Sequence, residues 1–600
     1  MNGKMNVSDY IFDFLIKKNV DTAFVVTGGQ AMYLNDAMAR RKEITPIFAH
    51  HEQTCSMAAD AFSRLSGKLG VAVVTAGPGS INALNGLVGG WCDSSPMMII
   101  SGQSTLKCVK YQEKSGIRQY GIQGIYIKPF VQNAVKYFVT VDDPSKIEFY
   151  MQKAYSEALS KRKGPVWIDV PLDIQRAEVP VNLLTSYAAD DLNISLNQRR
   201  LYAKKTADMI KTAKRPLIIA GQGIRSADAI QTLREFAEKN SIPIVTTRLG
   251  IDIINSDHPL YVGRPGNYGE RCANIAIQTA DLIISLGSRL SSASIGHDAE
   301  RFGCLAKKIV VDIDEKELEK PDFKIDLKIC DDVKLFLKEL SSCGKITGDT
   351  NDWASSCRFL KTKYPVVIDE YKKEEEINSY YFIDKLSQMS DKNSVILVDT
   401  GSCFHVACQT WKIKDGQRFL TTGGLSSMGW WVASIGACMA NNKHGVIVIT
   451  GDGSLQMNIQ EFATIKHNNL PVKVFVLNND GYLLIRQTQR NFMQNRLYGE
   501  SKESGVWCPD SLRIADAYGI KAVRINQKET LENGIREVLS YDGPVVCDVK
   551  VPKWQYIIPR VSSEKLPDGS LVSRKFEDMY PYLPKEELKT VINNIIKIGE

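Results

Sequence analysis

The sequence predicts an α/β protein built from three doubly wound parallel-sheet domains. Short β-branched runs typical of buried strands alternate with segments of helical periodicity along the chain. Two strand-and-turn motifs also occur twice, in the same order and at similar intervals: "GVAVVTAGPGSI" (70–81) matches "GVIVITGDGSL" (445–455), and "GPVWIDVPL" (164–172) matches "GPVVCDVKVP" (543–552). We therefore expect the first and third domains to be related by duplication, with chance resemblance as the alternative.

Strand-like runs and polar stretches set the expected domain boundaries. Polar stretches near 176–196 and 345–378 are typical of linkers. Four further strand-like runs between them, starting at Pro216, Ile242, Asp281 and Lys307, predict a second parallel α/β domain. The expected divisions are a first domain (1–176), a central domain (196–345), a third domain (379–555) and a C-terminal tail (556–600). The tail has Pro and Gly breaks and no clear periodicity, so we expect it to cover a surface or a site.

Composition places the chain among ordinary soluble globular proteins. Of 600 residues, 44% are hydrophobic and 24% charged, and the net charge of +7 is not concentrated in a basic tract, so nucleic acid is not an expected partner. No apolar stretch approaches the roughly 20 residues that span a membrane, and the N-terminus shows no signal segment. The 13 Cys are scattered without a CxxC pair, which favours reduced thiols in a cytoplasmic protein over disulfides or a zinc site.

An acid and an amide follow two strands of the third domain. Asp452 comes after the run 445–450, Asn479 comes after the run 472–477, and a helical pattern lies between them. A β-α-β crossover makes the strands parallel, so both side chains are expected at the carboxyl edge, where open α/β sheets bind ligands. Their oxygens suit Mg²⁺ that also takes oxygens from a bound phosphate. The alternatives are a plain Asp-Gly turn or an EF-hand; the latter fails because Met457 stands where that loop requires Gly.

The spacing from Gly-Asp-Gly to Asn-Asn resembles the signature of thiamin diphosphate (ThDP) enzymes. "HEQ" at 51–53 before an Ala-rich helix, "GPG" at 77–79 and "GLSSMG" at 424–429 precede it in the order seen in that group. The chain is most similar to the acetolactate synthase / pyruvate oxidase / benzoylformate decarboxylase superfamily, with acetolactate synthase nearest, over about residues 5–555. The resemblance implies a pyrimidine-binding first domain, a Rossmann-like central domain and a diphosphate-binding third domain.

The resemblance implies a catalytic role for Glu52, which would hydrogen-bond the cofactor's aminopyrimidine ring and so promote loss of the thiazolium C2 proton. Without it, an acid at a strand-to-helix junction would indicate only compensation of the helix dipole. Gln123 and Lys136 fall where the family keeps a Gln and a Lys near the active site. Either could equally be an ordinary surface residue.

The remaining cofactor contacts are also implied by the resemblance. Asp452, Asn479 and the Gly481 carbonyl would bind Mg²⁺, and backbone N–H groups after Gly453 would bind the diphosphate. Met428 matches the apolar residue that holds the cofactor in its V shape, although such a residue alone would more often belong to a core. The implied cofactor-binding residues are Gly29, Glu52, Pro78, His405, Gly424, Met428, Asp452, Gly453, Ser454, Asn479, Gly481 and Tyr482.

The sequence departs from acetolactate synthases at the substrate entrance. Phe404 stands where they usually carry Gln, and Thr488 where they usually carry Trp. With Tyr482 and Arg486 on the same loop, the acceptor is expected to be larger or more polar than pyruvate, such as a nucleotide-linked keto-sugar, because Arg suits bidentate recognition of phosphate. The alternative is that Arg486 merely pairs with a nearby acid and that the chain resembles a plain acetolactate synthase in its acceptor as well, and acetolactate-type chemistry remains the leading expectation.

The central domain leaves FAD binding open. Gly221, Gly223 and Arg289 resemble residues of FAD-binding loops in this superfamily. The segment 291–302, however, lacks the Asp-Arg pair that acetolactate synthases usually show. Similar central domains exist without a nucleotide.

The leading hypothesis is a ThDP- and Mg²⁺-dependent carboligase that decarboxylates a 2-keto acid, pyruvate in the first place, and adds the two-carbon unit to a carbonyl acceptor. Because the family's site forms between the first domain of one chain and the third domain of another, a homo-oligomer, at least a dimer, is expected. The alternatives are the same chemistry on a nucleotide-linked keto-sugar in surface-polysaccharide synthesis, a flavin-linked pyruvate oxidase, and a binding protein without catalysis. The intact Glu52, Asp452 and Asn479 argue against the last.

Overall fold

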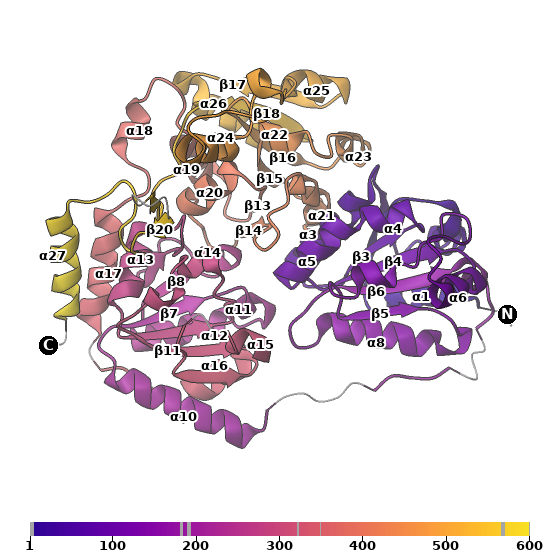
Figure 1. Cartoon of the computed structure of the whole chain (residues 1–600), viewed down its shortest axis with the longest axis horizontal. Coiled ribbons are helices and arrows are strands. Elements are labelled where there is room, and N and C mark those ends of the chain that lie inside the picture. Colours follow the sequence, from indigo (N-terminus) through magenta and orange to yellow (C-terminus); the bar gives the residue numbers. More distant parts are fainter. Residues whose placement is uncertain are drawn as a thin grey trace. The chain divides into compact units, whose positions relative to one another are not determined.

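The computed structural model describes residues 5–179, 184–188, 194–320, 323–348, 350–565 and 571–598. Its main elements are three six-stranded parallel sheets, each with helices around it (Figure 1), so the predicted fold class is confirmed. The chain divides into two compact units. The first contains residues 1–191, 394–403 and 420–551, and the second contains residues 192–393, 404–419 and 552–600.

The first sheet has the strand order β2-β1-β3-β4-β6-β5. Its strands are β1 (Thr22–Val25), β2 (Thr45–Phe48), β3 (Gly70–Val74), β4 (Met97–Gln103), β5 (Tyr137–Thr140) and β6 (Val166–Pro171). The main helices of this domain are α1 (Val7–Lys17), α2 (Met32–Ala39), α3 (Glu52–Ser66), α4 (Pro78–Asn82), α5 (Leu84–Asp93), α6 (Leu106–Ser115) and α8 (Ile147–Leu159).

The sheet of the third domain repeats this order as β14-β13-β15-β16-β18-β17. Its strands are β13 (Val395–Val398), β14 (Arg418–Thr421), β15 (Val446–Gly451), β16 (Val472–Asn478), β17 (Lys521–Ile525) and β18 (Val545–Lys550). Its main helices are α20 (Ser402–Thr410), α21 (Ser434–Ala440), α22 (Asp452–Leu455), α23 (Glu461–His467), α24 (Leu483–Phe492), α25 (Ser511–Ala517) and α26 (Leu531–Ser540). The two repeated motifs fall on β3 and β15 and on β6 and β18, which occupy matching places, so the topology confirms the predicted relationship.

Helix α3 lies at the core of the first unit because its small side chains admit close neighbours. Ala58 and Ala59 are fully buried. A Cβ on Gly70 of β3 would lie 2.1 Å from the Ala59 carbonyl oxygen, and a Cβ on Gly436 of α21 would lie 1.9 Å from that of Ala58. Both glycines are therefore required for backbone packing against α3, which fixes the position of its first residue, Glu52.

The central sheet has the order β12-β11-β10-β7-β8-β9, the strand order of a Rossmann fold. Its strands are β7 (Pro216–Ala220), β8 (Ile244–Thr246), β9 (Tyr261–Gly263), β10 (Leu282–Leu286), β11 (Lys307–Asp312) and β12 (Leu327–Cys330). Helices include α10 (Leu196–Thr212), α12 (Ile230–Asn240), α13 (Arg271–Thr279) and α16 (Val333–Ser341). The four strand-like runs that mark this domain correspond to β7, β8, β10 and β11. The short edge strands β9 and β12 carry too few residues to show a pattern.

The segment 345–378 is more structured than a linker. It contains α17 (Asn351–Lys363) and α18 (Asp369–Lys373). Trp353 of α17 is fully buried, and its indole Nε1 donates to the Pro216 carbonyl of β7 at 2.8 Å. The prediction of a plain linker therefore does not hold for this part of the segment, in which Trp353, Ala354, Cys357 and Leu360 recur at helical spacing and are buried. The other expected linker, 176–196, lies partly outside the described residues.

The C-terminal tail packs against the central domain within the second unit. Asn274 Nδ2 donates to the Phe576 carbonyl at 2.9 Å, and Arg215 Nη1 donates to the Ile596 carbonyl at 2.9 Å. The tail ends in a helix, α27 (Lys585–Ile596), whose Leu588, Val591, Ile592 and Ile595 recur at helical spacing and belong to or pack against the apolar cluster of the central domain. The tail therefore covers a surface of the central domain; residues 566–570 of it lie outside the described part.

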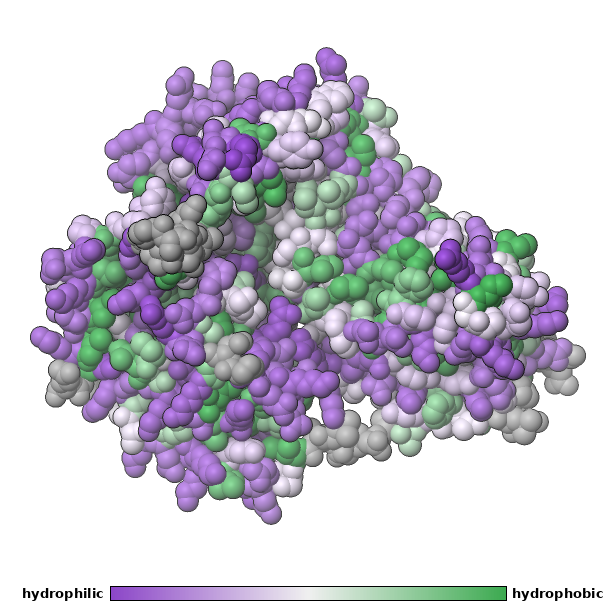
Figure 2. Space-filling model, viewed as in Figure 1, coloured by the Kyte–Doolittle hydropathy of each residue, from purple (hydrophilic) through white to green (hydrophobic). Residues whose placement is uncertain are grey.

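The surface is largely polar with apolar interruptions. Hydrophilic side chains cover most of the face in Figure 2, and green apolar patches lie between them. The most exposed large apolar side chains are Tyr498, Ile122 and Trp507, at 82%, 77% and 67% exposure. In the described ranges, no helix combines the length and apolar character that crossing a membrane requires.

Candidate active site

Asp452 follows β15 directly and begins α22. Its carboxylate accepts hydrogen bonds from two backbone groups, Gly453 N–H at 3.0 Å and Gly481 N–H at 2.9 Å. Because β15 and β16 pair in parallel through Gly451 and Leu477, the loops after both strands meet at this carboxyl edge. Burial raises the pKa of Asp452 to about 6, against an ordinary value of 3.8.

Asn479 follows β16 and supplies the second oxygen of this edge. The side chain is 3% exposed, and its Oδ1 has no hydrogen-bond partner among the described residues. Buried amide oxygens are normally paired, so a ligand is the expected partner. Gly481 has φ +123°, and a Cβ there would lie 2.0 Å from the Glu500 carbonyl oxygen. The carboxylate, the amide oxygen and the glycine turn fit a small hard cation such as Mg²⁺.

Arg486 holds this loop and does not face an acceptor. Its side chain is fully buried in α24 and forms an ion pair with Glu500. Its guanidinium also donates to the carbonyls of Asn479 at 3.2 Å and Asp480 at 2.8 Å. The expectation that Arg486 recognises an acceptor phosphate is therefore wrong, and the pairing alternative holds. The sequence showed the nearby acid only fourteen residues away, so the partner was not evident.

A buried acid that the sequence analysis missed ties the neighbouring loops together. Asp399, directly after β13, accepts from Ser454 Oγ at 2.6 Å, Thr450 Oγ1 at 2.9 Å and Trp430 N–H at 3.1 Å. Ser454 Oγ in turn accepts from Gly429 N–H at 2.8 Å. Asp399 could have been predicted from the sequence, because "VILVD" (395–399) is an apolar strand followed by an acid, the same pattern that precedes Asp452.

The loop 424–429 is held at both ends within the first unit. Gly424 N–H donates to Asp93 Oδ1 at 2.7 Å, and burial raises the pKa of Asp93 to about 6. At the other end, Gly429 is bound by Ser454 as described. Met428, partly buried beside Gly429, therefore lies on a loop with fixed ends.

Glu52 is the first residue of α3 and is 8% exposed. Its Oε2 accepts a hydrogen bond from Asn82 Nδ2 at 2.9 Å, a partner that the sequence did not reveal. A Cβ on Gly79 would lie 3.1 Å from Glu52 Oε1. The "GPG" turn therefore closes on the Glu52 carboxyl group.

Gln123 approaches the same turn through its backbone. It has φ +54° and is exposed, and a Cβ on Gly77 would lie 2.4 Å from the Gln123 carbonyl oxygen. Pro78 follows Gly77 and begins α4, while Gly29 begins a 3₁₀ turn (Gly29–Ala31) after β1. The structure thus brings Glu52, Pro78 and Gln123 together.

Tyr482 packs on the turn that carries Asp452. A Cβ on Gly453 would lie 2.2 Å from Tyr482 Cε1, so Gly453 is required by this ring. His405 lies on α20 in the second unit, where its ring packs against Tyr268 at 4.1 Å between centroids. Burial lowers the pKa of His405 to about 3, so the imidazole is neutral. Its role toward the cofactor stays a prediction.

Other expected residues have structural explanations. Lys136 Nζ donates to the carbonyls of Glu157 and Ser160 at the end of α8, which supports its reading as a residue outside the site. Cβ atoms on Gly221 and Gly223 would lie 2.2 Å from Gly287 O and 2.6 Å from Gly287 Cα. Close backbone packing therefore accounts for both glycines without a nucleotide, and FAD remains open.

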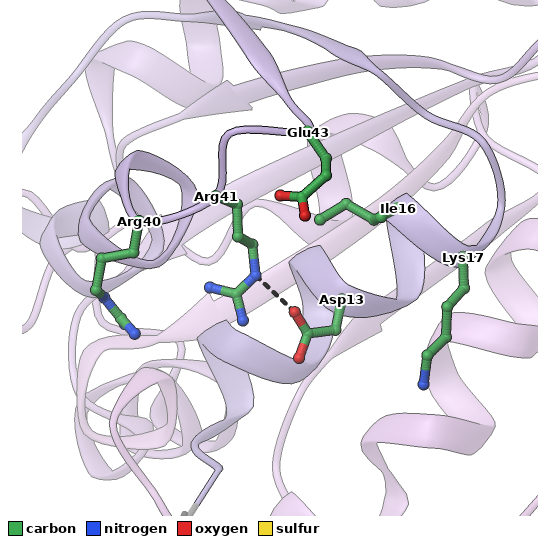
Figure 3. Close-up of a pocket in the computed structure, with 6 residues that line it drawn as sticks. All are labelled: Asp13, Ile16, Lys17, Arg40, Arg41 and Glu43. Carbon is green, nitrogen blue, oxygen red and sulfur yellow. Dashed lines mark hydrogen bonds and ion pairs between the residues drawn. The ribbon is translucent and has the colours of Figure 1, made fainter.

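A separate pocket contains none of the predicted site residues. It has a volume of about 430 Å³ and is lined by Asp13, Ile16, Lys17, Arg40, Arg41 and Glu43. Figure 3 shows Arg41 turned toward Asp13, to which its Nε donates at 2.7 Å. Both arginines also pair with Asp9, at 2.9 and 3.0 Å. Its two arginines are thus neutralised by acids of the same domain.

Comparison with known proteins gives matches along nearly the whole chain. Three family descriptions match: "Thiamine pyrophosphate enzyme, N-terminal TPP binding domain" at residues 5–126, "central domain" at 203–340, and "C-terminal TPP binding domain" at 399–549. Among similar proteins, the acetolactate synthase large subunit of Lactococcus lactis is 30% identical over 92% of this chain and 94% of its own. Acetolactate synthase 1 of Zea mays is 31% identical over 93% and 87%, and the probable large subunit of Methanococcus aeolicus 30% over 91% and 92%.

Proposed function

Because this chain belongs to the thiamine pyrophosphate (ThDP) enzymes of the acetolactate synthase-like superfamily, we propose that it decarboxylates a 2-keto acid, pyruvate in the first place, and joins the two-carbon unit to a carbonyl acceptor. The observation that carries the proposal is the buried Asn479 Oδ1 without a partner, beside the Asp452 carboxylate. These are the two side-chain oxygens that a Mg²⁺–diphosphate complex requires at this edge.

The chain's own residues would hold the cofactor at two carboxyl edges. Asp452, Asn479 and the Gly481 carbonyl would bind Mg²⁺, and backbone N–H groups from Gly453 onward would bind the diphosphate. Met428, on its loop with fixed ends, would support the cofactor between its two rings. When bound, ThDP supplies an electron sink for the carbanion that decarboxylation creates.

Glu52 would move the proton that starts the reaction. Its side chain is buried and held by Asn82, so its carboxyl group would be positioned to exchange a proton with a pyrimidine nitrogen of the cofactor. In the proposed reaction, the bond between the keto carbon and the carboxylate breaks and releases CO₂. The former keto carbon then bonds to the acceptor carbonyl carbon, whose oxygen takes up a proton.

Product analysis tests this function directly. The protein, supplied with ThDP and Mg²⁺, is incubated with ¹³C-labelled pyruvate and a panel of aldehydes and ketones, and the products are identified by mass spectrometry. A new product carrying two labelled carbons supports carboligation. Consumption of oxygen or quinone with acetate-level products would instead assign a flavin-linked oxidase, and no labelled CO₂ would refute both.

The substrate entrance favours an acceptor other than a second pyruvate. Thr488 lies at an exposed position of α24 and bonds its own helix, to the Leu484 carbonyl at 2.9 Å. It therefore adds little bulk where relatives are expected to carry Trp. A competition between pyruvate and larger carbonyl compounds as acceptors measures this preference.

The proposed active assembly is at least a homodimer. In this family the first domain of one chain faces the third domain of another, so Glu52 and Asp452 of one chain would serve different sites. A C₂ pair satisfies this requirement symmetrically. Sedimentation of the active protein tests it, and an active monomer would refute it.

A further inference from the structure

Three hydrogen-bond donors lie close together in the second unit. They are Arg248, in the 3₁₀ turn after β8 (Arg248–Gly250), Tyr268, in the loop after β9, and His405, on α20. The rings of Tyr268 and His405 pack at 4.1 Å, and the Arg248 guanidinium lies 5.2 Å from the centre of the Phe404 ring. The charge of Arg248 also lowers the pKa of His405, which indicates that the two are neighbours.

Arg248 lacks the carboxylate partner that the buried Arg199 and Arg264 have, and unlike Arg271, which donates to two backbone carbonyls, it has no hydrogen bond to any residue that the structure describes. Arg199 pairs with Asp331 at 2.7 Å and Arg264 with Glu270 at 3.5 Å. For Arg248 the structure shows no ion pair and no hydrogen bond within the described ranges, although burial is strong enough to lower its pKa. A guanidinium stays charged in proteins, and a partly buried charge without a counter-ion is costly. An anionic ligand would remove that cost.

The neighbouring donors are also unused. Neither the Tyr268 hydroxyl nor a ring nitrogen of His405 has a hydrogen-bond partner in the part of the chain that the structure describes. The neutral imidazole can donate one N–H and the phenol one O–H, beside the guanidinium fork. The guanidinium fork can bind two oxygens of an anionic group, and a terminal phosphate presents three strong acceptor oxygens to donors that come from three separate elements.

The arrangement also explains a departure from the family pattern. Phe404 stands where acetolactate synthases usually carry Gln, and here its ring supports the Arg248 guanidinium through a cation–π contact. The aromatic face orients the cation without neutralising it. Phe404 thus holds the Arg248 guanidinium in place. Arg248, and not the paired Arg486, has a positive charge available for a ligand.

We propose that Arg248, with Tyr268 and His405, binds a phosphate group carried by the carbonyl acceptor. This inference rests on the proposed function for the existence of an acceptor. It names the acceptor's chemical class: a carbonyl compound bearing a phosphate or diphosphate. The phosphate is recognised by the guanidinium fork and the two neutral donors, while the carbonyl group takes part in the reaction.

Binding of uridine diphosphate to the full-length protein, saturated with ThDP and Mg²⁺, tests the inference by calorimetry. Arg248→Met should weaken UDP binding at least about tenfold, because a hydrogen-bonded charge partner is lost. Tyr268→Phe keeps the ring and removes only the hydroxyl, so it should weaken binding about threefold to tenfold. Uridine, which lacks the diphosphate, should bind all variants alike within about twofold.

The matched control is Arg301→Met, the same substitution at an exposed arginine of the central domain that pairs with Asp298. It should leave UDP affinity unchanged. Wild-type protein that does not bind UDP, or Arg248→Met protein that binds it as wild type does, would overturn the inference. So would a loss confined to ThDP or to FAD affinity, since it would assign the guanidinium to a cofactor.

The donor half of the reaction separates this inference from the proposed function. Release of labelled CO₂ from pyruvate should be the same within about twofold in wild-type, Arg248→Met and Arg301→Met proteins. Absence of CO₂ release in all three would refute the proposed function whatever the UDP result. Normal CO₂ release with unchanged UDP binding in Arg248→Met would refute only the phosphate site.

Discussion

The first and third domains share one strand order and differ in what stands at the matching carboxyl edge. After β3 the chain turns through Gly77-Pro78-Gly79, whereas after β15 it turns through Gly451-Asp452-Gly453. Proline has no N–H and no charge, so the first turn only closes on a neighbouring carboxyl group, that of Glu52. The second turn carries its own carboxylate. The same strand order thus places a carboxyl group from a neighbouring helix beside the turn at one edge and a carboxylate within the turn itself at the other.

The two acids differ in the hydrogen-bond donors that their carboxyl groups accept from. Glu52 receives a side-chain amide, from Asn82, while Asp452 receives two backbone N–H groups and lies near an amide oxygen without a partner. Glu52 thus accepts one hydrogen bond from a neutral side chain. Asp452 accepts two backbone hydrogen bonds, and it is this carboxylate together with Asn479 Oδ1 that we propose as the cation ligands. Substituting either acid tests whether the two edges have different roles.

The largest expected effect is that of Asp452→Ala on cofactor binding. Loss of outer-shell partners costs about 10–100-fold in metal affinity, so loss of an anionic ligand should weaken ThDP–Mg²⁺ binding about a hundredfold or more and abolish activity. Calorimetry measures the affinity, with Asp391→Ala, an exposed acid before β13, as control. Unchanged ThDP affinity in the Asp452 variant would remove the metal assignment.

Glu52→Gln should slow loss of the C2 proton of bound ThDP without weakening ThDP binding. An amide cannot share a proton as a carboxylic acid does, so deuterium exchange at C2 of bound ThDP should slow about a hundredfold, with ThDP affinity within a few-fold of wild type. NMR after acid quench follows the exchange, and Glu43→Gln, an exposed acid of the same domain, is the control. Exchange at the wild-type rate would take Glu52 out of the mechanism.

Lowering the pH should weaken cofactor binding at the third domain's edge. Burial raises the pKa of Asp452 in the cofactor-free protein to about 6, and only the carboxylate binds the cation. Below pH 6 a proton must be displaced, so ThDP–Mg²⁺ affinity should fall up to about tenfold per pH unit, while above pH 7 it should be flat. An Asp with an ordinary pKa would show this only below pH 4. Equal affinity at pH 5 and pH 7 would contradict the prediction.

The smallest expected effect is a partial recovery on mixing two inactive variants. If the edges that cooperate come from different chains, random reassembly of Glu52→Gln with Asp452→Ala protein should restore about a quarter of the sites. Activity after joint unfolding and refolding, or after dissociation and reassociation, measures it. The separately treated variants are the controls. No recovery, with dimers present in sedimentation, would indicate that both edges of a site belong to one chain.

The sequence allowed the sheets and the acids at their edges to be located, because buried strands are continuous apolar runs and Asp452 and Glu52 stand at the start of the helices that follow such strands. Edge strands β9 and β12 are too short to show a period, whereas the buried residues of helix α17 stand at helical spacing and polar neighbours separate them. The partners of the acids, Asn82 for Glu52 and Glu500 for Arg486, could not be predicted, since they depend on which loops meet in space. The unpaired state of Arg248 is visible only when all its neighbours are known.

The tail that covers the central domain has a consequence for the order in which the chain folds. The bond from Arg215 to the Ile596 carbonyl joins residues 381 positions apart, and Phe576, Val591 and Ile595 belong to the same apolar cluster as Leu217 of β7. At ribosomal speeds of about 5–20 residues per second, these partners emerge roughly 20–80 seconds after β7. The central domain therefore completes its core last, after the third domain has left the ribosome. Until residues 576–596 have been synthesised, the apolar face of the central domain that they cover stays exposed to solvent.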